Sequence, residues 1–141
     1  MTVGRLSRVL ISFSLAITAV NSAQAHHSFA AIWDVSRSFD MTGTLVKIDW
    51  INPHSYVYVD QLGSDGVVLH YSFEGFPPQM LRHFGVSKDA FDSHVGQRVT
   101  VTAYAAKDGS KTLGFGRTYK FDDGTTIVAL RDPKDAQAVQ Q

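Results

Sequence analysis

The sequence predicts an all-β protein with one short helix, and three observations lead to this fold class. From Gly43 onward, apolar and polar residues alternate with the two-residue period of half-buried strands. Turn-forming residues separate these runs. A helix beginning at Pro77-Pro78 stands between the first three strands and those that follow. This order predicts an OB-fold-like small barrel of five strands, with the helix between strands three and four.

The first three strands are expected to form an antiparallel meander. The first covers residues 43–50 and ends before Asn52-Pro53, a tight turn in which proline presets φ. The second covers residues 55–62, and the turn at 63–66 leads into the third at 67–74. Apolar residues of these and the later runs are expected in the core: Val46, Ile48, Val57, Val59, Leu69, Val99 and Val101.

The connection after the third strand is expected to be helical. Pro77-Pro78 favours a helix start, and the helix covers residues 79–84 and ends at Gly85. Ser87 is expected to be the N-cap of one further helical turn. The remaining strands are expected at residues 97–105, 112–121 and 125–130.

Residues 1–25 have the composition of a secretory signal peptide. Arg5 and Arg8 precede an apolar run at 9–20, and Ala23-Gln24-Ala25 has the small-residue pattern of a cleavage site. The apolar run is too short to span a bilayer. We therefore expect a periplasmic or secreted protein that begins at His26 and has no membrane span.

The rest of the chain is expected to form one domain. Apolar residues such as Phe29 and Trp33 precede the first predicted strand and favour a segment that packs on the barrel. The expected organisation is a signal peptide at 1–25, an N-terminal segment packed on the barrel at 26–42, the barrel at 43–130 and a polar tail at 131–141.

Composition excludes several classes of function. The chain has 13 basic and 13 acidic residues, and removal of Arg5 and Arg8 leaves a small excess of acidic ones. Nucleic acid is therefore not expected as a partner, because its recognition requires a basic patch. The chain has no cysteine, which rules out disulfides, thiol catalysis and thiolate metal sites.

The predicted meander gathers polar residues at one end of the barrel. In an antiparallel meander, the end of strand one, the start of strand two and the end of strand three lie at the same rim. This rim brings together Trp50, Asn52, His54 and Glu74, the only glutamate of the chain. It includes the loop between strands one and two, which binds ligands in OB-folds.

The expected mature N-terminus adds possible metal ligands. Cleavage after Ala25 gives His26 a free α-amine, which chelates a metal together with its imidazole, and His27 follows. With His54 as a third donor, the set is rich in nitrogen and suits copper, zinc or nickel. The sequence thus indicates a copper site, or a site for another divalent metal, with His26, His27 and His54 as ligands.

Plainer interpretations of these residues stay open. The paired histidines are also consistent with a solvated polar start, and His54 with a turn residue bonded to the backbone. Glu74 is also consistent with a cap of the helix that follows it. The other histidines, His70, His83 and His94, are expected to be surface or structural residues.

The sequence favours a binding module over an enzyme. Neither G-x-S-x-G nor H-E-x-x-H occurs, and no arrangement pairs a nucleophile with a base. The first interpretation is a periplasmic module that binds copper or another divalent metal. The alternative is a non-metal binding or adaptor domain for a small polar ligand, a glycan or a periplasmic protein partner.

Several short motifs also resemble a known family. They are the H-H-S-F-A run at 26–30, the W-x-N-P-H element at 50–54, and Phe73-Glu74. With these motifs the chain resembles an uncharacterised family of small exported bacterial proteins, over nearly all of its length after residue 25. The resemblance implies export and implies no particular activity. Ile51 and Tyr71 depart from the family pattern, in which threonine and tryptophan are common at these positions.

Overall fold

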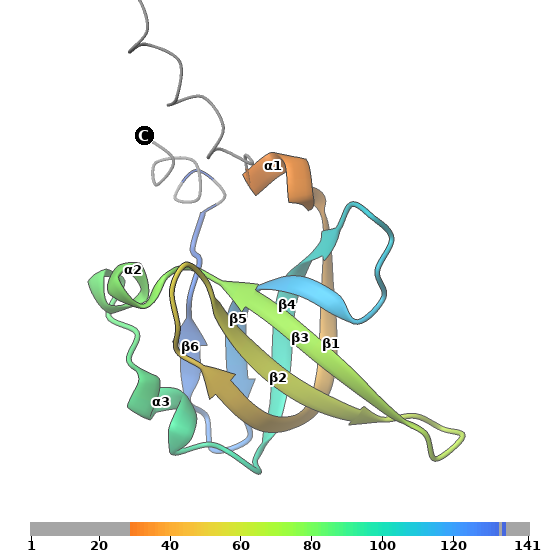
Figure 1. Cartoon of the computed structure of the whole chain (residues 1–141). Helices are drawn as coiled ribbons and strands as arrows, with labels where there is room; N and C mark the ends of the chain where they lie inside the picture. The colour runs from red at the N-terminus through yellow and green to blue at the C-terminus, as the bar shows by residue number, and fades with distance from the viewer. Residues whose placement is uncertain (1–28, 133, 135–141) are drawn as a thin grey trace, which may run out of the picture.

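The computed structural model describes residues 29–132 and residue 134. Six strands and three short helices follow one another along this part of the chain (Figure 1). In order they are α1 (Phe29–Ile32), β1 (Trp33–Asp49), β2 (Ser55–Leu62), β3 (Val68–Gly75), α2 (Pro78–His83), α3 (Lys88–Asp92), β4 (Arg98–Ala106), β5 (Leu113–Phe121) and β6 (Thr126–Val128).

The strands form a closed barrel. Hydrogen bonding joins them in the order β3-β2-β1-β4-β5-β6, and β3 also pairs with β5. This second pairing is parallel, from Ser72 opposite Leu113 to Glu74 opposite Phe115, and it closes a ring of five strands. All other pairings are antiparallel. The predicted OB-fold-like barrel is confirmed.

Two short helices connect β3 to β4, at the positions of the predicted helix and of the further helical turn after Ser87. Helix α2 has Pro78 in its first turn, which suits a residue without an N–H because that group has no partner in a first helical turn. Helix α3 is capped as expected, since the Ser87 side chain accepts a hydrogen bond from the Ala90 N–H at 3.2 Å. Neither these helices nor any other helix among the described residues is long and apolar enough to cross a membrane.

Strand β1 begins at Trp33, well before the expected start at Gly43. Its N-terminal half pairs with β4, from Trp33 opposite Ala106 to Thr44 opposite Arg98, and its C-terminal half pairs with β2. A register shift between Asp34 and Ser38 interrupts the two-residue alternation, which hides this part of the strand in the sequence. The expected boundary between a segment at 26–42 and a barrel at 43–130 therefore falls inside β1.

Because of a second irregularity in β1, the observed core differs from the predicted one. The register against β2 shifts between Leu45 and Lys47, so Val46 is an extra residue of β1. The alternation of inward and outward side chains therefore changes at Val46. Leu45 and Ile48 are consequently buried, whereas Val46 is exposed. The expectation that Val46 is a core residue was wrong because a bulge adds one residue to the alternation.

The expectation that Leu69 is buried was also wrong. Leu69 lies in the hairpin of β2 and β3, which extends away from the barrel (Figure 1). The tip of this hairpin exposes Leu62, Val67, Val68 and Leu69. Alternation in this hairpin therefore does not indicate which side chains reach the core.

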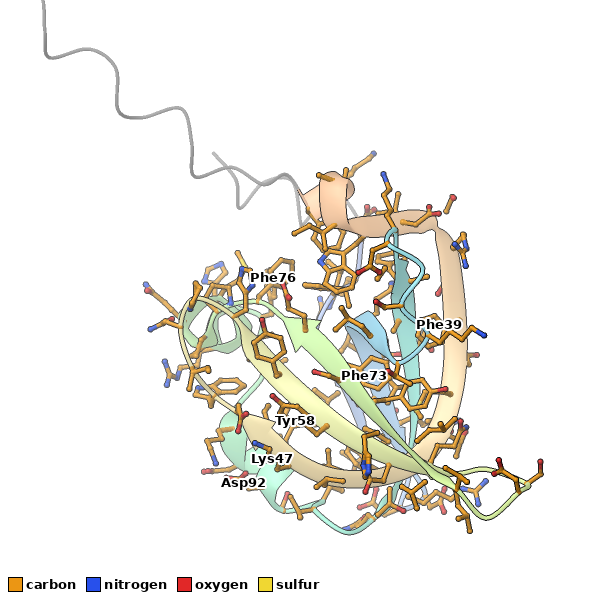
Figure 2. The ribbon with its side chains drawn as sticks, turned by 45° about the vertical axis from the view of Figure 1, so that its right-hand side comes forward. Phe39, Lys47, Tyr58, Phe73, Phe76 and Asp92 are labelled. Carbon is orange, nitrogen blue, oxygen red and sulfur yellow. The ribbon has the colours of Figure 1, made fainter. Side chains whose placement is uncertain are left out.

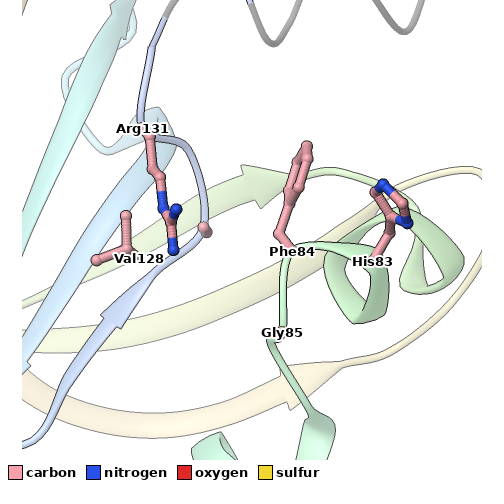
Figure 3. A pocket seen from close by; sticks show the side chains of 6 residues that line it. His83, Phe84, Gly85, Val128 and Arg131 are labelled. Atoms are coloured by element: carbon pink, nitrogen blue, oxygen red, sulfur yellow. The ribbon is translucent and has the colours of Figure 1, made fainter.

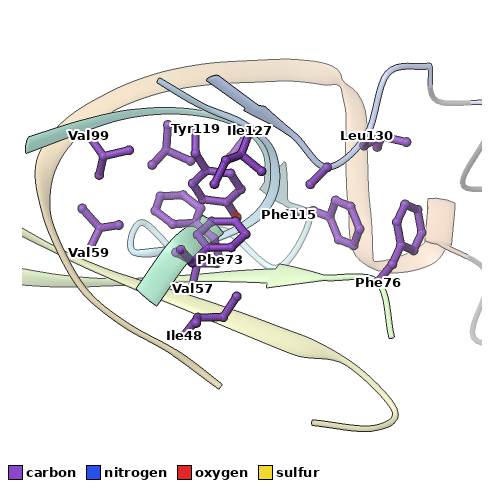
Figure 4. Packing of buried hydrophobic residues seen from close by; sticks show 14 of the residues in the cluster. Ile48, Val57, Val59, Phe73, Phe76, Val99, Phe115, Tyr119, Ile127 and Leu130 are labelled. Carbon is purple, nitrogen blue, oxygen red and sulfur yellow. The ribbon is translucent and has the colours of Figure 1, made fainter. Parts of the chain in front are cut away.

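Aromatic residues fill the interior of the barrel. Phe73 is fully buried, and its ring packs near Tyr119 with ring centres 6.4 Å apart (Figure 4). The other predicted core valines are buried as expected, with Ile48 beside them. The most deeply buried large side chains are Trp33, Tyr119, Phe73, Phe91, Phe121, Leu45, Leu130, Val59, Val99 and Val101.

Candidate functional site

His54 and Glu74 meet at the predicted end of the barrel. His54 directly precedes β2, and Glu74 is the penultimate residue of β3. The two strands pair in register, with Ser55 opposite Gly75. The imidazole Nδ1 of His54 lies 2.7 Å from Oε1 of Glu74. We call this end, with the loop from Trp50 to His54 and Glu74, the β1–β2 rim.

A third side chain holds the carboxylate of Glu74. The Tyr56 hydroxyl donates a hydrogen bond to Oε2 at 3.3 Å, because Tyr56 lies directly opposite Glu74 in the β2–β3 ladder. Each carboxylate oxygen therefore has its own partner. Tyr56 was not among the residues predicted for this site, although its register opposite Glu74 follows from the length of the hairpin.

The local environment is different for the two members of the pair. The Glu74 side chain is 14% exposed and that of His54 is 44% exposed. Burial raises the pKa of Glu74, while the nearby His54 and the hydrogen bond from Tyr56 act in the opposite direction. Burial also raises the pKa of Tyr56, with a further contribution from Glu74. The pair thus combines a half-buried acceptor with an accessible imidazole.

Backbone packing beside the pair fixes the start of β2. The Ser55 hydroxyl donates to the carbonyl of Phe76 at 2.9 Å. Gly75 makes room for this hydroxyl, because a side chain at Gly75 would place its Cβ 2.7 Å from Ser55 Oγ. Ser55 is 2% exposed, so His54 is attached to a rigid and buried neighbour.

The interpretation of Glu74 as a helix cap was wrong. The residue at the N-cap of α2 is Pro77, and no side chain caps this helix. Glu74 instead belongs to β3 and binds His54 and Tyr56. The neighbouring interpretation, in which His54 binds the backbone, also differs from the observed contact with a carboxylate.

The other predicted members of the rim are placed differently. Trp50 is half-buried, and the Arg82 guanidinium lies over its ring at 5.8 Å. Asn52 is exposed and precedes a cis peptide bond to Pro53. An open cavity of about 570 Å³ lies along α2 and is lined by Arg82 and Met80. The rim thus extends from the His54–Glu74 pair toward α2.

The complete predicted metal site cannot be traced in the structure, because His26 and His27 lie outside the described residues. Within residues 29–132 and 134, no group of three His, Asp or Glu side chains is placed to hold a metal ion. His54 and Glu74 therefore supply at most two members of any such set from the described part of the chain.

The other three histidines have structural or surface positions, as expected. His94 is buried, and its ring nitrogens bind the Ala90 carbonyl at 2.7 Å and the Asp123 carboxylate at 3.0 Å. His70 is exposed and pairs with Asp60. His83 lines an open pocket of about 500 Å³ between α2 and the end of β6 (Figure 3).

Ser93 lies near His94 and Asp123, an arrangement that resembles a hydrolase triad in composition. The Ser93 hydroxyl is 3.1 Å from His94 Nδ1. That nitrogen, however, is 2.7 Å from the Ala90 carbonyl, which accepts a hydrogen bond and so requires a proton on Nδ1. A protonated nitrogen cannot take the proton of Ser93. This cluster therefore joins α3 to the β5–β6 turn.

These features define a small OB-fold-like barrel with a histidine–carboxylate pair on the rim between β1 and β2. Residues 14–115 match the model of a family of unknown function, DUF6152, and the chain belongs to this family. Neither a curated protein nor a solved structure matches the chain significantly.

Proposed function

We propose that this protein is an exported binding module that holds a divalent metal, Cu(II) in preference to Zn(II), at the β1–β2 rim. The ligands are the α-amine and imidazole of His26, exposed by removal of residues 1–25, together with the imidazole of His54; His27, the next residue in the chain, is a further imidazole donor of the proposed set. The observation that carries this proposal is the contact of 2.7 Å between His54 Nδ1 and Glu74.

The contact supports the proposal because it prepares His54 as a ligand. Glu74 accepts the Nδ1 proton of His54, and the lone pair of Nε2 is then the one that binds a metal. Metal-binding histidines commonly donate their second nitrogen to a carboxylate, which orients the ring and raises its basicity. The accessible ring of His54 and the more buried carboxylate of Glu74 have this arrangement.

The position of Phe29 supports the participation of His26. The Phe29 ring packs on Phe115 with ring centres 4.7 Å apart, and Phe115 lies opposite Glu74 in the β3–β5 ladder. Phe29 is therefore anchored close to the strand that carries Glu74. His26 precedes Phe29 by three residues, and an extended chain covers roughly 3.3 Å per residue, or about 10 Å in all. The proposed chelate uses this reach of the segment between His26 and Phe29.

The donor set determines the expected metal. Two imidazoles and an amine are nitrogen donors, and such a site binds Cu(II) more tightly than Zn(II) in the Irving–Williams order. Zinc sites in proteins, by comparison, are tetrahedral and generally use four ligands.

Processing is the first prediction. Intact-mass analysis of the exported protein is expected to give a chain that begins at His26, because Ala23-Gln24-Ala25 is the cleavage pattern that follows the apolar run. Recovery of a chain that retains Met1 from the periplasmic fraction would contradict both export and the free amine of His26.

Copper affinity is the second prediction. Calorimetric titration of the protein beginning at His26 is expected to show Cu(II) binding with one site per chain. One extra residue before His26, or His54→Ala, is expected to weaken binding sharply, because each removes a nitrogen donor from the metal. Glu74→Gln is expected to weaken Cu(II) binding about 10- to 100-fold, because Glu74 orients His54.

His83→Ala is the matched control, since His83 is exposed on α2 and does not belong to the proposed set. It is expected to leave the affinity unchanged. Equal Cu(II) binding by the native, extended and His54→Ala proteins would refute the site. Circular dichroism of each variant distinguishes a lost ligand from a lost fold.

A further inference from the structure

A second opening lies in the barrel wall, and we call it the side cleft. It has a volume of about 700 Å³. Its first side is the part of β1 from Ser36 to Met41, and the turn at 109–111 forms another. Gln61 of β2, Tyr71 of β3, and Ala105 and Ala106 of β4 complete the lining. Phe39 lines the cleft, and its ring lies next to that of the buried Phe73 (Figure 2).

The backbone of β1 presents alternate residues to this cleft. Leu45 donates its N–H to Gln97 and accepts a bond from Gly96, so its polar groups point toward the β4 side. The Thr42 carbonyl instead points to the other side, where the Gln61 side chain donates to it at 3.1 Å. The register with β4 is continuous from Ser38 to Thr44. Because orientation alternates along a strand, Ser38 and Asp40 also direct their N–H and C=O groups away from β4.

Among the residues that the structure describes, no strand lies beside this edge of β1. Strand β2 pairs with β1 only from Thr44 onward, opposite Asp60, and then continues into the projecting hairpin. The Gln61 amide occupies the position at Thr42 where a neighbouring strand would donate a peptide N–H. The bulge between Asp34 and Ser38 ends the regular edge on the other side. A short stretch of open edge therefore remains at Ser38–Asp40.

The side chains around this edge combine an aromatic surface with positive charge. Tyr71 stacks on Phe73 at 6.0 Å, and Phe39 packs against the same ring at 6.4 Å. Arg37 and Lys111 line the cleft on opposite sides. The one carboxylate of the lining, Asp40, accepts a hydrogen bond from the Thr102 hydroxyl at 2.6 Å. The two cations outnumber it.

We propose that the side cleft binds an extended acidic peptide segment of a partner protein, which adds to β1 as a short strand at Ser38–Asp40. The peptide backbone pairs with the outward N–H and C=O groups of these two residues, as in other strand-addition complexes. Its alternate side chains lie on Phe39 and Tyr71, and its acidic groups lie near Arg37 and Lys111. The open edge favours a peptide over a sugar, since it offers backbone groups at strand spacing.

This proposal is independent of the metal site. The side cleft is lined by residues of β1, β2, β3, β4 and the β4–β5 turn, and none of them belongs to the β1–β2 rim. Loss of copper binding is therefore not expected to change peptide binding, and the two proposals fail separately.

The test is an NMR titration of the ¹⁵N-labelled protein with a blocked Thr-Glu-Thr-Glu-Thr-Glu peptide at millimolar concentration. Amide shifts are expected at Ser38–Met41 and at 109–111. A Thr-Lys-Thr-Lys-Thr-Lys peptide is expected to bind about 5- to 10-fold more weakly, because its charge repels Arg37 and Lys111. The acidic peptide can be N-methylated at its odd or at its even residues. One of these two patterns is expected to abolish the shifts, because it removes the N–H groups that face β1, and the other is expected to leave them.

Lys111→Glu is expected to weaken the acidic peptide about 5- to 10-fold. Lys120→Glu is the matched control, because Lys120 is exposed on β5 and does not line the cleft. Absence of shifts, shifts confined to another surface, or equal binding of both N-methylation patterns would overturn strand addition. Binding of maltotriose at the same amides without peptide binding would overturn the proposal and identify a glycan as the ligand of the side cleft.

Discussion

Phe73→Ala is expected to lower the free energy of unfolding by about 3–5 kcal/mol, the range for removing a fully buried aromatic ring. Phe73 is 0% exposed and lies where β3 pairs with both β2 and β5. Its ring is close to those of Phe39, Tyr71 and Tyr119. These neighbours belong to three different strands, β1, β3 and β5, so the barrel cannot collapse easily onto the space that the ring leaves.

Leu69→Ala is the matched control for this substitution. Leu69 lies on the same strand but is 41% exposed on the projecting hairpin. Its truncation is expected to change the free energy of unfolding by no more than about 0.5 kcal/mol. Urea denaturation followed by tyrosine and tryptophan fluorescence measures both values. Similar losses for the two variants would contradict the assignment of Phe73 to the core and Leu69 to the surface.

The fold class was predictable because local signals along this chain agree. Strand β2 has the predicted bounds, and the turns before and after it carry proline or glycine. The helix after Pro77 and the cap at Ser87 are also local features of the sequence. Such signals determine the order of strands and helices, and that order was sufficient to predict the barrel.

Irregular pairing explains what the alternation could not predict. The bulges after Asp34 and Leu45 each interrupt the two-residue period of β1. Because of the first bulge, the N-terminal half of β1 was not predicted as a strand. Because of the second, Leu45 is in the core and Val46 is exposed. A bulge depends on how two distant strands meet, and the sequence of one strand does not contain that information.

Part of the candidate site was also predictable, because the order of the strands determines which of their ends meet. A meander necessarily brings the start of β2 to the end of β3, so the proximity of His54 and Glu74 followed from topology alone. The contact of Trp50 with Arg82 depends on where α2 packs. The side cleft depends on the length of β1 and the direction of the hairpin. Neither could be derived from spacing along the chain.

The second large effect on stability is expected from the substitution Gly116→Ala in β5. Gly116 lies opposite Ala103, beside a register shift at which β5 has one extra residue, Arg117. A Cβ at this position would overlap the Tyr119 hydroxyl and lie 2.6 Å from Cζ of the same ring. Tyr119 is 2% exposed and packs edge-on against Phe91 at 5.0 Å, so its ring has little freedom to move away.

We expect Gly116→Ala to lower the free energy of unfolding by about 3 kcal/mol, the upper end of the usual range for overpacking a core. The sign is informative, because Gly→Ala at an unstrained position normally stabilises a protein by about 0.4–1 kcal/mol through the unfolded state. Thr118→Ala, two residues away on the same strand, is the control and is expected to cost much less.

Tyr119→Phe tests whether the overlap with the hydroxyl is the cause. It removes the atom nearest to the new Cβ, although the ring carbon Cζ remains. The double variant Gly116→Ala/Tyr119→Phe is therefore expected to lose less stability than the sum of the two single losses, with a coupling of about 1 kcal/mol in a double-mutant cycle. Strictly additive losses would show that Gly116 is required for a reason other than the approach of Tyr119. A coupling of the expected sign would instead identify this glycine as the position that lets β5 bend around the ring of Tyr119.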